Sequence, residues 1–207
     1  MAKITALKFQ KKNRDRVSVY LDGRFAFGLP AIVAARLKPG QALTDVEIAA
    51  LREEGDAEGS YNRALNYLSY RPRSRAEIET YLRRRGVSEG HIAAITSRLE
   101  RAGFVDDAAF ARFWVENRER FRPKGPRALR YELRGKGLAD EEIEAALIAV
   151  DAVESAYRAA AKKARQLSHR DEVTFQRKLV EYLARRGFDY EVARQVAARH
   201  WSELAGT

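Results

Sequence analysis

The sequence predicts a mainly helical protein with three tandem three-helix repeats in an elongated array, preceded by a small β-meander with two short helices. Two observations predict this architecture. Strand-like alternation is confined to the first part of the chain, and helical patterns recur further on at offsets of 51 and 50 residues. The 207 residues are 45% hydrophobic and 33% charged, which is typical of a soluble globular protein that is rich in charge.

The N-terminal segment alternates between apolar and polar residues. Residues 4–9 and 16–21 follow this pattern, and the polar stretch Lys11–Asp15 predicts a turn between the two strands. Asp22 and Gly23 tolerate positive φ, so they predict a tight hairpin to a third strand over residues 24–28. The three strands form an antiparallel meander.

Two short helices are expected after the meander. Pro30 opens the first, and Lys38-Pro39-Gly40 ends it. Thr44 and Glu47 have the spacing of a capping box and start the second helix. We expect both helices to cover one face of the sheet. The acidic, glycine-containing stretch at 53–59 predicts a linker.

An internal repeat organises the rest of the chain. The basic loop at 70–74, Tyr-Arg-Pro-Arg-Ser, recurs at 121–125 as Phe-Arg-Pro-Lys-Gly. The third copy lacks this proline loop, and Val192, its counterpart of Ile143, sits one residue early. The residues that match in the following helix are Ile78, Leu82 and Gly86, then Leu129, Leu133 and Gly137, and finally Leu179, Leu183 and Gly187.

Each copy can be built as three helices. Ser74 with Glu77 forms a second capping box, and Gly125 with Pro126 starts the matching helix in the next copy. The recurring glycine ends that helix in a left-handed conformation, and Ser88 or Asp140 starts the third helix. Because one such unit buries little core alone, stacked copies should share apolar faces. The expected domains are residues 1–57, 58–105, 106–150 and 151–207.

Several classes of function are disfavoured by the residues. Cysteine is absent and the three histidines are scattered, which predicts no disulfide, metal site or cofactor. No nucleotide-binding or hydrolase motif is present, and the acidic pairs at 106–107 and 141–142 are better explained as helix starts. We therefore expect a protein that is not an enzyme. The start of the chain does not resemble a signal peptide, and no apolar run is long enough for a membrane helix, so a cytoplasmic protein without membrane contact is expected.

Positive charge is the strongest functional signal. The net charge is +10, and residues 118–136 contain eight basic and two acidic residues. Arg127, Arg130 and Arg134 fall on one helical face. Residues 63–85 repeat the pattern with seven arginines and two acids. A solvated helix face is the simpler explanation, but the single sign of the charge and its recurrence in two repeats favour a regularly spaced anionic partner.

Aromatic residues lie among the basic clusters and could stack on unpaired bases. At helical spacing most of them are expected in the core, and Tyr70 and Phe121, beside the two basic loops, are the best exposed candidates. The full set is Tyr61, Tyr67, Tyr70, Tyr81, Phe110, Phe113, Trp114 and Phe121.

Residues 60–150 resemble the RecX family of regulatory proteins. The resemblance rests on the loop Tyr67–Ser74 with the helix that ends in Arg83-Arg84-Arg85-Gly86, on Gly103-Phe104-Val105-Asp106-Asp107, and on the loop Phe121–Pro126. The third repeat is similar but weaker, and the N-terminal meander resembles an extension found in some members only.

This resemblance implies a monomeric regulator that binds the filament of the RecA recombinase on DNA and suppresses its ATP hydrolysis and strand exchange, which would modulate recombination, DNA repair and the SOS response. The alternative is a general module for single- or double-stranded DNA without a dedicated protein partner, and an enzyme is a distant third. The candidate filament- and DNA-binding residues are Arg71, Arg73, Arg75, Arg83, Arg84, Arg85, Arg122, Lys124, Arg127, Arg130 and Arg134.

Overall fold

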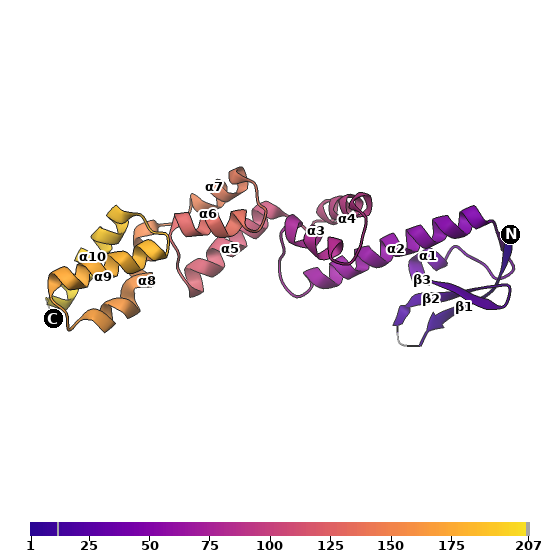
Figure 1. The fold of residues 1–207 in the computed structure, drawn as a ribbon, viewed down its shortest axis with the longest axis horizontal. Helices are drawn as coiled ribbons and strands as arrows, with labels where there is room; N and C mark the ends of the chain where they lie inside the picture. Colours follow the sequence, from indigo (N-terminus) through magenta and orange to yellow (C-terminus); the bar gives the residue numbers. More distant parts are fainter. Residues whose placement is uncertain (12, 206–207) are drawn as a thin grey trace. The chain divides into compact units, whose positions relative to one another are not determined.

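The computed structural model describes residues 1–11 and 13–205, and its chain forms two compact units. The first contains residues 1–72 and 78–104, and the second contains residues 73–77 and 105–207. Figure 1 follows the chain from the N-terminal strands to the C-terminal helices. The elements are β1 (Ala2–Gln10), β2 (Asn13–Leu21), β3 (Arg24–Pro30), α1 (Ala31–Ala34), β4 (Ala42–Leu43), α2 (Asp45–Leu68), α3 (Arg75–Arg83), α4 (Glu89–Arg101), α5 (Asp107–Phe121), α6 (Pro126–Arg134), α7 (Asp140–Leu147), α8 (Ala152–Leu167), α9 (Glu172–Arg185) and α10 (Tyr190–Ala205).

The N-terminal strands form an antiparallel sheet in the order β3-β2-β1-β4. The predicted meander is confirmed, and its tight turn has positive φ at both Asp22 (48°) and Gly23 (81°). The short strand β4 was not predicted because two residues are too few to show alternation. The predicted turn at 11–15 is shorter than expected, since β2 begins at Asn13. Lys12, which was predicted in that turn, lies outside the described residues.

One face of the sheet is covered by α1 and the beginning of α2, as predicted. Ile4, Val19 and Leu29 are fully buried there and pack with Leu51 of α2. The first helix is shorter than expected: it begins after its N-cap Pro30 but has only four residues and ends at Ala34, before Lys38-Pro39-Gly40. The predicted capping box is confirmed: the Glu47 amide donates to the Thr44 hydroxyl at 3.2 Å, and the Thr44 amide donates to the Glu47 carboxylate at 2.7 Å.

The predicted linker at 53–59 is wrong, because α2, a helix of 24 residues, runs through this segment without a break. Its two glycines are buried, and Gly55 serves close packing. A Cβ built at Gly55 would lie only 2.4 Å from Leu29 Cδ2, whereas one built at Gly59 would meet Arg16 Nη1 at 3.5 Å, which is an ordinary contact. Glycine at position 55 therefore lets the helix approach the sheet.

Three three-helix repeats follow, as the sequence predicts. They consist of the second half of α2 with α3 and α4, then α5–α7, and finally α8–α10. Ile92 and Ile143 are buried at the same position in the last helices of the first two repeats. In the third repeat that position is taken by Ala193, which is fully buried, whereas Val192 is half-buried. The correspondence proposed for Val192 is therefore wrong, and the 50-residue offset holds through the third repeat.

The recurring glycines end their helices as predicted. Gly86, Gly137 and Gly187 have φ of 74°, 80° and 83°. At the first of them, the Gly86 amide donates to the Arg83 carbonyl at 3.0 Å and the Val87 amide to the Leu82 carbonyl at 3.3 Å. These two bonds define a Schellman motif, which satisfies carbonyls at the end of the helix.

Within the second unit, the N-terminal end of one repeat's middle helix meets the C-terminal end of the next repeat's middle helix. The Ser74 hydroxyl donates to the Lys136 carbonyl at 2.7 Å. At the next junction, between the second and third repeats, the Gly125 amide donates to the Arg186 carbonyl at 2.9 Å. The same contact between middle helices is therefore made at both junctions, once by a side-chain donor and once by a backbone donor. The internal repeat thus includes the junctions between repeats as well as their helices.

Candidate functional site

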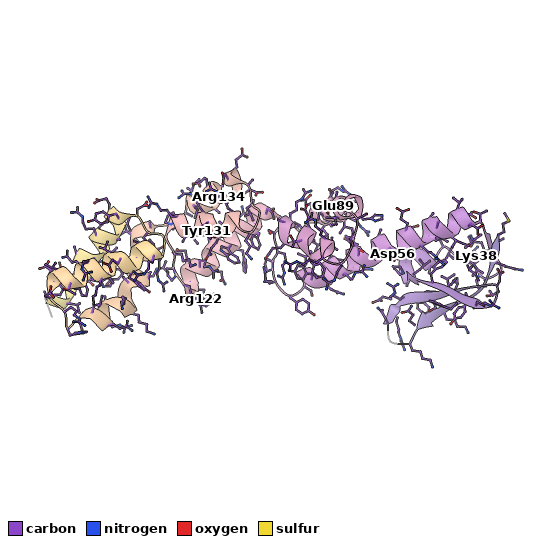
Figure 2. All side chains as sticks on the ribbon, in the orientation of Figure 1. Lys38, Asp56, Glu89, Arg122, Tyr131 and Arg134 are labelled. Atoms are coloured by element: carbon purple, nitrogen blue, oxygen red, sulfur yellow. The ribbon has the colours of Figure 1, made fainter. Side chains whose placement is uncertain are left out.

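The exposed face of α6 carries the arginines that the sequence predicted on one side of this helix. Gly125 caps the helix and Pro126 is its first residue, while Leu129 and Leu133 are fully buried on the opposite side. The structure therefore brings Arg127, Arg130 and Arg134 to the surface of one helix. Figure 2 labels Arg134 on this helix and Arg122 in the loop before it.

Each of these three arginines is paired with an acid from a following helix or loop. Arg130 donates to Glu144 from Nε at 2.6 Å and from Nη2 at 2.8 Å. Arg134 donates to Asp140 at 2.8 Å, and Arg127 Nε lies 2.8 Å from an Asp189 oxygen. The hydrogen bonds from Arg134 and Arg130 hold the pKa values of Asp140 and Glu144 below their ordinary values.

These pairs correct one argument from the sequence. The charge of residues 118–136 has one dominant sign along the chain, but in space the acids of the next helices lie among the arginines. A count of charges within one sequence segment cannot include acidic partners that folding brings from another segment. Because the pairs are exposed, each contributes little to stability, and salt screens it.

In the first repeat, the predicted arginines lie in three different surroundings. Arg83 makes a bidentate pair with Glu89, with N–O distances of 2.7 and 3.0 Å. The Arg85 guanidinium lies 3.8 Å from the centre of the Tyr81 ring. Arg84 is exposed, and the described part of the chain places no acid against it.

The loop arginines of this repeat are half-buried. Arg71 donates to the Pro72 carbonyl at 2.8 Å. Arg73 and Arg75 are also half-buried, and the Arg75 backbone amide donates to the Asp107 carboxylate at 2.8 Å. Because these side chains are half-buried, only part of each is open to a partner.

Lys124 has a structural role that the sequence did not indicate. It pairs with Glu132, whose carboxylate also accepts hydrogen bonds at 2.8 Å from Trp114 Nε1 and Arg118 Nε. Only 16% of the Glu132 side chain is exposed. Burial disfavours its charge, but the bonds from Lys124, Arg118 and Trp114 prevail and leave the pKa of Glu132 below its ordinary value.

The two aromatic candidates in the basic loops are exposed, as expected. Tyr70 is 83% exposed and Phe121 65% exposed. Arg122, which follows Phe121, is exposed and has no acidic partner among the described residues. By contrast, Tyr67 and Tyr81 stack on each other with ring centres 4.0 Å apart. The exposed surface therefore presents an aromatic ring next to an arginine in two loops.

Sequence reasoning missed an exposed aromatic residue among the arginines of α6. Tyr131 lies on α6 and is 82% exposed. Helical spacing places it between Arg127 and Arg134, four residues after the first and three before the second. That spacing was visible in the sequence and could have identified it.

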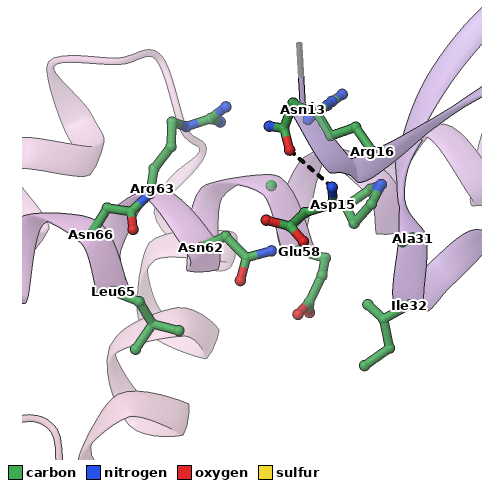
Figure 3. Close-up of a pocket in the computed structure, with 12 residues that line it drawn as sticks. Asn13, Asp15, Arg16, Ala31, Ile32, Glu58, Asn62, Arg63, Leu65 and Asn66 are labelled. Atoms are coloured by element: carbon green, nitrogen blue, oxygen red, sulfur yellow. Dashed lines mark hydrogen bonds between the residues drawn. The ribbon is translucent and has the colours of Figure 1, made fainter. Parts of the chain in front are cut away.

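A cleft of about 660 Å³ lies between the N-terminal sheet and α2 in the first unit (Figure 3). Arg16 and Arg63 border the cleft beside Gly59, where a Cβ would lie 3.5 Å from Arg16 Nη1 and 3.9 Å from Arg63 Nη1. Asp15 and Glu58 also line it. Because charges of both signs are present, the cleft does not select an anion or a cation.

Among the described residues 1–11 and 13–205, no group of three or more histidine, cysteine or acidic side chains is placed to hold a metal ion. No helix among these residues is both long and apolar enough to cross a membrane.

Family models match almost the whole chain. The RecX first, second and third three-helix domains match residues 61–99, 106–147 and 149–197. The regulatory protein RecX N-terminal domain matches residues 2–44. The chain belongs to the RecX family. The match at 2–44 also shows that the N-terminal sheet is a family domain.

RecX proteins of two bacteria illustrate the sequence similarity. The regulatory protein RecX of Bacillus subtilis (strain 168) is 34% identical over 195 residues, covering 91% of this chain and 74% of the relative. That of Listeria monocytogenes serovar 1/2a is 31% identical over 208 residues, covering 98% of this chain and 77% of the relative.

Solved RecX structures have the same fold. A crystal structure of regulatory protein RecX aligns with a TM-score of 0.77 and 30% identity, covering 95% of this chain and 98% of the other. The structure of RecX from Lactobacillus salivarius aligns with a TM-score of 0.65 and 32% identity, covering 73% of this chain and 98% of the other.

Proposed function

We propose that this RecX protein binds the RecA–DNA filament and inhibits RecA ATPase and strand exchange, thereby modulating recombination, DNA repair and the SOS response. The match of four RecX family models along the chain carries the proposal. The protein acts by binding, as a cytoplasmic monomer, and its action includes no catalytic step.

The arginine-rich loops and helices of the first two repeats form the proposed filament-facing surface. Arginine suits this role because its planar fork pairs with carboxylates of a protein and with phosphates of DNA. The exposed pairs on α6 are weak, so an arriving anion can take the place of their acids. The surface consists of Arg71, Arg73, Arg75, Arg83, Arg84, Arg85, Arg122, Lys124, Arg127, Arg130 and Arg134.

Inhibition of RecA ATPase tests the proposal. RecA on saturating single-stranded DNA is titrated with the protein, and ATP hydrolysis should fall at ratios too low to coat the DNA. Inhibition that appears only when the strand is covered, with a steep dependence on salt, would instead indicate a general DNA-binding module.

A triple variant tests the α6 surface. Arg127, Arg130 and Arg134 are replaced by alanine, and inhibition should be lost while circular dichroism shows unchanged helicity. The matched control replaces Arg177, Arg185 and Arg194, three exposed arginines of the third repeat, and should inhibit normally. Equal inhibition by both triple variants and the parent would show that the α6 arginines are only a solvated face.

A further inference from the structure

Tyr131 is an exposed aromatic residue at the centre of a basic helix face. The side chain is 82% exposed, whereas its neighbours Leu129 and Leu133 are fully buried. Arg127 and Arg134 are separated by about 10 Å along the helix axis, with Tyr131 between them. A planar apolar surface is therefore presented between two guanidinium groups.

Packing does not require tyrosine at this position. The matching residue is Thr80 in the first repeat and Glu181 in the third, and both are exposed on the same kind of helix. Since the repeats fold with a hydroxyl-bearing or an acidic side chain there, the aromatic ring is not part of the fold's core.

The flanking residues also differ between the repeats. At the two positions that flank the central residue, the first repeat has Ala76 and Arg83, and the third has Arg177 and Ala184. Among the three repeats, all of which are described at these positions, the second alone combines an aromatic ring with arginine on both sides.

The two arginines can leave their acids at low cost. Arg127 and its partner Asp189 have 73% and 57% of their side chains exposed, and Arg134 and Asp140 have 58% and 67% exposed. Asp140 is the first residue of α7, and Asp189 immediately precedes α10. An acid at a helix N-terminus is stabilised there by the backbone dipoles, so it tolerates the departure of its arginine.

We propose that Tyr131 stacks on an unpaired base of single-stranded DNA while Arg127 and Arg134 bind the phosphates on either side. Every base has a face that can stack on an aromatic ring, so the contact is independent of sequence. This inference deepens the proposed function, because it rests on α6 facing the filament, but it can be tested on DNA alone.

The test is binding of the full chain to a fluorescein-labelled oligothymidylate, followed by fluorescence anisotropy. Tyr131→Ala should weaken binding about tenfold, within the range measured for loss of one stacked base. Tyr131→Phe should bind as the parent does, because it keeps the ring. Ile148→Ala, which removes another apolar side chain that is 86% exposed in the same repeat, is the matched control and should have no effect.

A duplex of the same length distinguishes stacking from a backbone contact. Paired bases cannot stack on Tyr131, so Tyr131→Ala should bind the duplex as the parent does. An equal loss on both forms of DNA, no loss on either, or failure of the parent to bind the oligothymidylate would overturn the proposal. A Tyr131→Trp variant adds a direct readout, because stacking should quench its emission beyond any change in the parent's two tryptophans.

RecA ATPase inhibition by Tyr131→Ala separates this inference from the proposed function. Weaker DNA binding with normal inhibition supports base stacking and shows that regulation does not depend on it. Lost inhibition with normal DNA binding overturns base stacking and assigns Tyr131 to a contact with RecA, while the proposed function stands.

Discussion

Gly137 lies directly against Ala76, so that a Cβ at position 137 would come within 2.4 Å of the Ala76 Cβ. The residue also has a φ of +80°, which side chains disfavour. Two independent constraints therefore select glycine here, one from the end of its own helix and one from the neighbouring helix within the second unit.

Substitution of Gly137 should separate these two constraints. Gly86 has a similar φ of 74°, but a Cβ there would meet nothing within 4 Å. Gly86→Ala should therefore lower the free energy of unfolding by about 1 kcal/mol through backbone strain alone. Gly137→Ala should cost more, about 2 kcal/mol, because overpacking is added. Urea denaturation followed by circular dichroism measures both, and equal losses would show that the neighbouring helix moves aside freely.

Gly55→Ala should destabilise the protein although it replaces glycine inside a helix. Alanine at such a position usually stabilises by about 0.5–1 kcal/mol, but here its methyl group would meet Leu29 at 2.4 Å. Gly90→Ala in α4, where the space is open, is the control and should raise the melting temperature. A rise for both variants would show that Leu29 moves aside and that close packing does not require glycine at 55.

Glu132 should make stability depend on pH. Its pKa is lower in the folded protein, so the stabilisation is present above the unfolded pKa of about 4.3 and is lost as the pH falls through the folded value. Glu132→Gln should cost about 2 kcal/mol at neutral pH, between the effects of exposed and fully buried pairs. That difference from the parent should shrink in acid. Denaturation at neutral and acidic pH measures it, with Glu144→Gln as a control for an exposed pair. A difference that does not change with pH would contradict this assignment.

The repeat offsets of 51 and 50 residues predict an extended particle in solution. In a tandem array each repeat contacts only its neighbours, so the radius of gyration grows with their number. Small-angle scattering should give a radius clearly above the roughly 17 Å of a globule of 207 residues. A value near that of the globule would mean that the repeats fold back on one another.

Most of the fold could be predicted from local sequence chemistry. The capping residue Thr44, the turn at Asp22-Gly23 and the helix-ending glycines act within a few residues of the chain, and each was confirmed. Gly55 was misread as a sign of flexibility because its reason is Leu29, which lies in another element. Val192 was misassigned because alanine at 193 gives a weak apolar signal.

The candidate surface was predictable only as a set of positive charges. Helical periodicity correctly placed Arg127, Arg130 and Arg134 on one face. Their acidic partners could not be found in the same way, because Asp189 is 62 residues from Arg127 in the chain. Pairing depends on tertiary contacts, whereas periodicity describes one helix at a time.

No single cut through the backbone can separate the two compact units. The chain passes from one to the other after residues 72, 77 and 104, so residues 73–77 belong with the part that resumes at 105. A fragment ending at residue 104 would take these five residues away from the Ser74–Lys136 junction, and a fragment beginning at 105 would lack them. To express the second unit by itself, residues 73–77 must therefore be joined genetically to the fragment that begins at residue 105.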